Sequence, residues 1–178
     1  MDKPKNAMRL IIIVALFLIF TEDSKGQAVD TSLVTMQTDK ITGRKSIASK
    51  PMTLRNESDK DALLIYVLKS NANQSIIFVI KDKSGSISCT QENDAVNFLF
   101  SDDSKMQLDS NGKFNCQGES VLYFHGVWGR EGKLNELKSK PLSAIRIWGM
   151  SNHSDGNLNN LQAENFMKAL RIVDEYKF

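Results

Sequence analysis

The chain has 178 residues, of which 41% are hydrophobic and 25% are charged, and its formal net charge is +2 at pH 7. This length suits a single domain with a core of its own. A nearly neutral chain has no field that would concentrate nucleic acid or an anionic membrane, so neither is an expected partner.

The first 26 residues have the layout of a secretory signal peptide. Basic residues precede an apolar run at 10–20, and a polar tail with small residues at Ser24 and Gly26 follows it. A helix needs about 20 apolar residues to cross a bilayer, so this run is too short for stable insertion. We predict cleavage after Gly26, with Ala28 as the alternative, and a secreted or periplasmic mature chain. A retained anchor and a buried core helix are the competing interpretations.

Residues 27–60 are predicted to form a polar N-terminal arm with an early hairpin that turns at Gly43. Residues 61–178 are predicted to form a single β-rich domain. Its first two strands, 62–70 and 75–83, are rich in Ile, Val, Phe and Tyr and are separated by a short polar loop, which favours an antiparallel hairpin. Further strands are expected at 85–91, 95–101, 105–110, 120–127 and 143–150, with an Asn-Gly turn cue at 111–112.

The C-terminal part of the chain changes character. Residues 131–142 predict a short helix closed by Pro141, and 151–160 is expected to be a loop. The segment 161–176 predicts the one long helix, capped by Asn159 or Asn160. Its predicted apolar stripe consists of Ala163, Phe166, Met167, Leu170 and Val173.

This order of elements predicts a β-rich α+β fold, an antiparallel β-sandwich or barrel with a short helix and a C-terminal α-helix packed on it. Turn cues recur about every 10 residues, a spacing typical of both architectures. The choice between sandwich and barrel stays open at this stage.

Cys89 and Cys116 are the only two cysteines in the chain. In an exported protein a lone pair of cysteines favours a disulfide, because the compartment is oxidising. The alternative is two unpaired buried thiols, which behave as small hydrophobic groups.

Three aromatic residues are the candidate ligand-binding residues. Trp128 and Trp148 each stand beside a glycine near a strand end, and Tyr123 belongs to the strand before Trp128. In the strand at 143–150, alternation places Trp148 with Arg146 on the face opposite to the isoleucines. Exposed indoles can form a platform for a sugar or an apolar ligand; the alternative is that they close the edge of the core.

No pattern in the chain indicates a catalytic or metal site. A zinc site needs three or four ligands, and the two histidines, His125 and His153, have no ligand partners at a recognisable spacing. The loop 151–160 is rich in oxygen ligands but lacks the spacing of a calcium-binding hand. We therefore predict no catalytic residues, no metal and no cofactor.

Three segments resemble small exported proteins of unknown function from Bacteroidetes-type bacteria. They are the signal that ends in Gly-Gln, the stretch TDKITGRKSI (38–47), and the pair LSAIRIWG (142–149) and AENFMKALRIV (163–173). The resemblance implies export and an architecture that ends in a short helix, a strand and a terminal helix. It implies no activity.

The sequence thus favours an exported, non-catalytic binding or interaction module. Its expected partner is an envelope protein or a small ligand. The alternatives are an exported hydrolase with a site scattered over strand ends, and a component of an envelope assembly that pairs through an exposed strand edge.

Overall fold

The computed structural model describes residues 30–72, 75–125 and 127–178, and the predicted signal peptide lies outside them. These residues form a ten-stranded antiparallel sheet and two helices. The strands are β1 (Val34–Thr38), β2 (Lys45–Ser49), β3 (Met52–Arg55), β4 (Asp61–Ser70), β5 (Ile77–Asp82), β6 (Ala95–Phe100), β7 (Lys105–Asp109), β8 (Glu119–Tyr123), β9 (Leu142–Trp148) and β10 (His153–Asn157). The helices are α2 (Arg130–Ser139) and α3 (Asn160–Glu175).

The long strand β4 organises the sheet. One of its edges pairs with β5, which continues to β8. Its other edge is shared, because β3 pairs with the first half of β4 and β2 pairs with its end. From β3 the sheet runs on through β10, β9 and β6 to β7, and from β2 it branches to β1.

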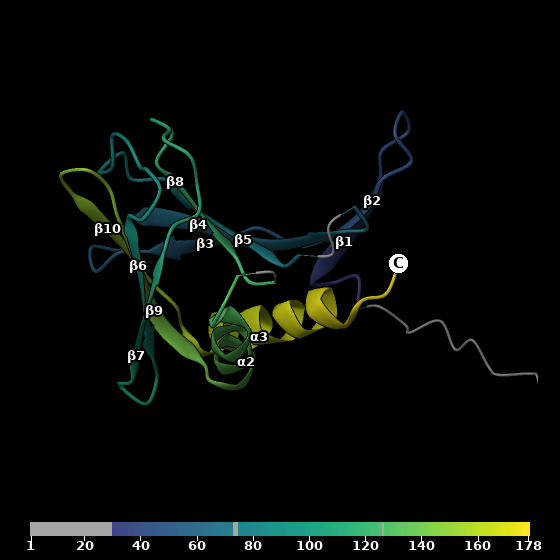
Figure 1. Cartoon of the computed structure of the whole chain (residues 1–178). Coiled ribbons are helices and arrows are strands. Elements are labelled where there is room, and N and C mark those ends of the chain that lie inside the picture. The colour runs from purple at the N-terminus through teal and green to yellow at the C-terminus, as the bar shows by residue number, and fades with distance from the viewer. Residues whose placement is uncertain (1–29, 73–74, 126) are drawn as a thin grey trace, which may run out of the picture.

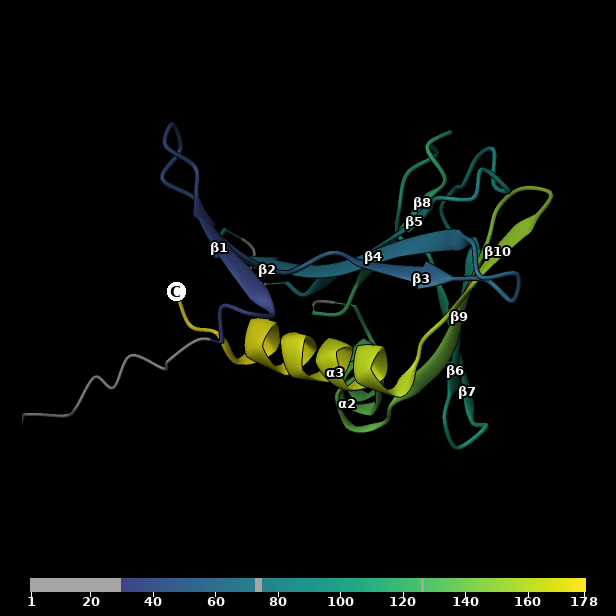
Figure 2. The same cartoon turned by 180° about the vertical axis from the view of Figure 1, so that it is seen from behind.

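The sheet bends so that α2 and α3 lie on its concave side (Figure 1). Seen from behind, α3 runs beneath β3 and β4, and the β1–β2 hairpin projects beyond the body (Figure 2). Phe78 of β5 stands at the centre of the core, with its ring centroid 5.9 Å from that of Phe98 and 5.2 Å from that of Phe166. One sheet and one helical layer thus share a single core.

This arrangement confirms the predicted β-rich α+β class and the C-terminal helix. The sheet is not closed into a ring of paired strands. Between β8 and the end of β7, the buried Arg130 donates to Asp109 O (2.5 Å) and to Asn111 Oδ1 (2.6 Å). The backbone N–H of Asn111 donates to Val121 O (2.7 Å). The side chain of Asn111 also accepts the N–H of Tyr123 on β8 (3.0 Å), so side-chain contacts and one backbone hydrogen bond link β8 to the end of β7 where no ladder forms.

Helix α3 begins where the sequence predicts it. The side chain of Asn159 accepts from the N–H of Gln162, and the side chain of Gln162 accepts from the N–H of Asn159, so a complete capping box is present. The buried face matches the predicted stripe except that Ala169 is buried and Met167 is only half-buried.

Two expected elements differ from the structure. Residues 151–160 are not all loop, because 153–157 form β10, which pairs with β9 along its whole length. Conversely, 85–91 is not a strand: Gly85 has a positive φ of 73°, and only Thr90 forms an isolated bridge, to Asn115. The carboxylate of Asp82 explains this irregular path, since it accepts the N–H of Ile87 and holds the loop against the end of β5.

The predicted tight turn at 111–112 is also absent, because the chain continues beside β8 instead of reversing. The N-terminal hairpin is confirmed, with Gly43 at a φ of 68°. Val34, Ile47 and Leu54, which come from the segment expected as an arm, are fully buried in the common core.

The predicted disulfide is confirmed. Cys89 and Cys116 are bonded, and they join the loop after β5 to the loop before β8. No helix among the described residues is long and apolar enough to cross a membrane.

Candidate functional site

The largest of the described hollows is a groove of about 650 Å³ on the face of β6, β7, β9 and β10 that points away from the helices. Ligand pockets commonly measure 300–1,000 Å³, so the groove has the size of a binding site. Its polar lining consists of Glu57, Asn97, Lys105, Gln107, Arg146, Asp155 and Asn157, and Leu99 and Ala144 are among its apolar residues.

Strand alternation builds this face. Phe98, Met106 and Ile145 point to the core and are buried, so their neighbours along each strand face outward. Gln107 lies opposite Asn97 in the register of β7 and β6, and Asn97 lies opposite Arg146 of β9.

Arg146 in turn lies opposite Asp155 of β10. Four neighbouring strands thus contribute one side chain each to a continuous polar row, which we call the outer-face row: Gln107, Asn97, Arg146 and Asp155. At an interstrand spacing of about 4.8 Å, the row is about 14 Å long.

One half of the outer-face row is an ion pair. Arg146 donates from Nε to Asp155 Oδ1 and from Nη2 to Asp155 Oδ2, both at 2.6 Å. This bidentate geometry fixes both side chains, and the hydrogen bonds to Asp155 raise the pKa of Arg146 above its usual value. The other half is free: the amides of Asn97 and Gln107 make no hydrogen bond within the described part of the chain.

Trp148 lies on the same outer face, two residues after Arg146 on β9. Its ring centroid is 4.8 Å from that of His153, its partner on β10, and the guanidinium of Arg146 stands 5.7 Å from the indole centroid. These contacts hold the indole on two sides while 37% of the residue stays exposed. The aromatic surface is therefore fixed in position before any ligand arrives.

A second, smaller hollow of about 280 Å³ opens beside β10 and shares Glu57 and Asp155 with the groove. We call it the polar notch; its remaining lining residues are Asn56, Ser58, Ala62, Ser84, Ser86, His153 and Ser154. His153 Nε2 is 3.8 Å from Asp155 Oδ2. The notch thus places one histidine and two carboxylates around a polar hollow that borders the groove.

The serines of the notch are engaged with a buried carboxylate. Ser84 Oγ donates to Asp82 Oδ1 (2.6 Å), and the N–H of Ile87 donates to Asp82 Oδ2 (2.9 Å). Burial opposes the charged form of Asp82, but these hydrogen bonds, with one from Ser154, outweigh burial and lower the pKa of Asp82 below its usual value. Asp82 is therefore an ionised structural anchor beside the notch.

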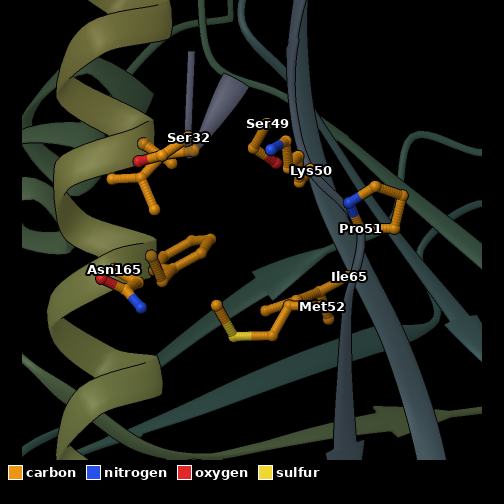
Figure 3. A pocket seen from close by; sticks show the side chains of 10 residues that line it. Ser32, Ser49, Lys50, Pro51, Met52, Ile65 and Asn165 are labelled. Carbon is orange, nitrogen blue, oxygen red and sulfur yellow. The ribbon is translucent and has the colours of Figure 1, made fainter. Parts of the chain in front are cut away.

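A third hollow, of about 140 Å³, lies between α3, the segment that precedes β1, and the strands β2 to β4. Figure 3 shows Asn165 of α3 on one side of it, with Met52 and Ile65 on the sheet side. Ser49 at its rim already accepts the N–H of Val67 (2.9 Å). Its volume is close to that of a cavity that holds one benzene-sized group, so the groove is the better candidate site.

The three aromatic residues predicted as ligand contacts do not lie together in the groove. Trp148 borders the outer-face row, whereas Trp128 is fully exposed before α2 and Tyr123 is half-buried on β8. None of the three lines the groove or the polar notch, although Trp148 stands beside Arg146, which lines the groove. A ligand-binding role for all three residues stays a prediction.

The two histidines are likewise separate. His125 Nε2 lies 3.6 Å from Asp174 Oδ1, near the end of α3, and His153 lies in the polar notch. No group of three or more His, Cys, Asp or Glu side chains that could hold a metal ion occurs among the residues that the structure describes.

Sequence reasoning did not single out Asn97, Gln107 or Asp155. Their signal is alternation: each follows or precedes a buried residue on its strand. Alternation identifies an outward face but not its neighbours, so the outer-face row becomes visible only with the strand register.

Comparison of the chain with protein-family models, with curated protein sequences and with solved structures gives no match. The outer-face groove and the polar notch are therefore the basis of the functional argument.

Proposed function

We propose that the protein is an exported, non-catalytic binding module that holds its ligand in the outer-face groove. The observation that carries this proposal is the free half of the outer-face row. Asn97 and Gln107 present their amides to a groove of about 650 Å³ and have no partner within the described part of the chain. Such convergent polar groups in a concave surface are typical of a ligand site.

The ion pair of Arg146 and Asp155 supports a binding function rather than a catalytic one. Asp155 holds Arg146 through both carboxylate oxygens, so its charge is compensated and its orientation is set. A general base needs a free lone pair directed at the substrate, whereas a recognition site needs rigid neighbours. The ion pair supplies that rigidity beside the free amides.

Export is the second part of the proposal. It is supported by the basic, apolar and small-residue order of residues 1–26 and by the bond between Cys89 and Cys116, which suits an oxidising compartment. The mature chain is then secreted or periplasmic, and its ligand comes from that space.

The test is ligand capture by the mature chain, immobilised and exposed to material from the native envelope and growth medium, with bound molecules identified by mass spectrometry. Ala144→Trp fills the groove between Leu99 and Asn157 and should abolish capture. Gly132→Trp is the matched control, because Gly132 on α2 faces open space. Each variant must first show the melting temperature of a folded protein. Equal capture of the same molecule by both variants would refute the groove as the site.

An exported hydrolase is the second candidate function. It is favoured by one observation, that His153, Glu57 and Asp155 meet in the polar notch beside the groove. Incubation of the captured ligand with the protein decides between the two. Return of the intact ligand supports a binding module; cleavage that Glu57→Gln abolishes would establish the hydrolase.

A further inference from the structure

We propose that the groove binds a neutral oligosaccharide, with its chain lying across β7, β6, β9 and β10 and one sugar ring stacked on Trp148; this inference rests on the proposed function. The outer-face row is about 14 Å long, which exceeds the width of one sugar ring, so the ligand is an oligomer.

The charges of the groove are balanced. Its charged lining residues are Glu57, Lys105, Arg146 and Asp155, two of each sign. Arg146 and Asp155 neutralise each other in direct contact. A phosphate, a nucleic acid or an acidic polymer needs an excess of cations, which this surface does not offer. The balance matches a ligand without charge.

The free side chains match hydroxyl groups. Each amide, of Asn97 and of Gln107, has a carbonyl oxygen that accepts and an NH₂ group that donates two hydrogen bonds. Adjacent hydroxyls of a sugar both donate and accept, so one planar amide can serve two of them. Leu99 and Ala144, next to these amides, provide an apolar floor for the C–H groups of the ring.

The position of the groove argues against an extended peptide. Peptides bind sheets by adding a strand to a free edge, where backbone groups lack partners. The floor of this groove is the face of paired strands, and the N–H and C=O groups of β6 and β9 are used in their ladders. Recognition on this face must come from side chains, as it does for a saccharide.

Trp148 completes the site. The ring of His153 and the guanidinium of Arg146 hold the indole in place, so stacking costs little conformational entropy. An indole offers a large flat apolar surface, and a sugar ring offers a complementary C–H face. Trp148 lies two residues beyond Arg146 along β9, so its indole stands about 7 Å to the side of the outer-face row, and a sugar unit bound over Arg146 lies next to it.

The experiment uses the mature chain, a set of neutral oligosaccharides and a matched set of uronic or sulfated ones, with affinity measured by calorimetry. We expect a neutral oligosaccharide to bind with the same affinity at low and high salt. Asn97→Ala combined with Gln107→Ala should weaken binding about tenfold or more, since two hydrogen bonds are lost. Trp148→Ala should weaken it to a similar degree.

The controls are Asn135→Ala, an exposed amide on α2, and Phe114→Ala, an exposed aromatic residue on a loop. Both should bind as the parent protein does. Amide hydrogen exchange with the best ligand should show protection in β6 and β9 and none in α2.

The outcomes separate the two proposals. If only acidic sugars or peptides bind and protection still maps to β6 and β9, the neutral-saccharide class is wrong and the groove remains the site. If neutral sugars bind but protection maps elsewhere, or if Ala144→Trp binds as well as the parent, both the saccharide ligand in the groove and the groove as the binding site are refuted. If a bound sugar is cleaved, the ligand class stands and the non-catalytic function is refuted.

Discussion

Gly156→Ala should destabilise the domain through a single added methyl group. Gly156 lies on the buried side of β10, and a Cβ built there would stand 2.7 Å from Leu54 Cβ and 3.1 Å from Leu63 Cδ1. Leu54 is fully buried and its Cβ is fixed to the backbone of β3, so it cannot turn away. Overpacking of this kind costs about 1–3 kcal/mol. For a domain of about 150 residues, the melting temperature should fall by about 3–9 °C.

The cause can be isolated with a double-mutant cycle. Leu54→Ala alone should cost about 2–5 kcal/mol because it opens a cavity. In the double variant the methyl group added by Gly156→Ala occupies part of that cavity, so the combined loss should be smaller than the sum of the separate losses by at least about 1 kcal/mol. Chemical unfolding followed by tryptophan fluorescence measures both. Gly132→Ala, on the open side of α2, is the control and should be neutral or stabilise by about 0.5–1 kcal/mol. Additive losses, or a stable Gly156→Ala, would refute the packing argument.

Three contacts outside the groove give further predictions. Replacing Cys89 and Cys116 by serine should lower the free energy of unfolding by about 3–4 kcal/mol in denaturant titrations, since the bond closes a loop of 27 residues; an unchanged midpoint would contradict this. Hydrogen bonds from Ser104, with Lys140 nearby, lower the pKa of Asp102 from 3.8 to about 2, so the stabilisation it provides is complete above 3.8 and is lost as the pH falls through about 2. NMR titration should show this value, and Ser104→Ala should raise it toward 3.8. Asn159→Ala should cost about 1 kcal/mol by removing the cap of α3, and thermal unfolding that matches the parent would speak against it.

Long apolar runs made most of the sheet predictable. β4 and β5 stand out in the sequence because Leu, Ile, Val and Phe fill them nearly without interruption. β10 escaped prediction because its inward residues are Ser154 and Gly156, which carry no hydrophobic signal. The close contact with Leu54 requires a glycine at position 156. The packing that holds β10 in place therefore also removes the alternating hydrophobic pattern by which β10 could have been predicted.

The candidate site was predictable only in part. Alternation along β9 correctly assigns Trp148 and Arg146 to one face. The contribution of Asn97 and Gln107 depends on which strands are neighbours and in what register, and that is decided by contacts far apart in the sequence. Polar residues on an outward face do not indicate a binding site unless the residues beside them on neighbouring strands are also known.

The hydrogen bonds of Arg130 and Asn111 connect the end of β7 to β8 without a regular ladder. The alignment of the strands on either side therefore does not depend on the length of the loop between them. Where a ladder joins two strands, an inserted residue shifts every later pair and turns side chains to the opposite face. Here a guanidinium and an amide span the seam, so residues can be gained or lost at 113–114, before the bridged Asn115 and Cys116, while β6, β7 and β9 keep their alignment. Divergent versions of this protein should accordingly vary in length at that seam while preserving the spacing of the groove.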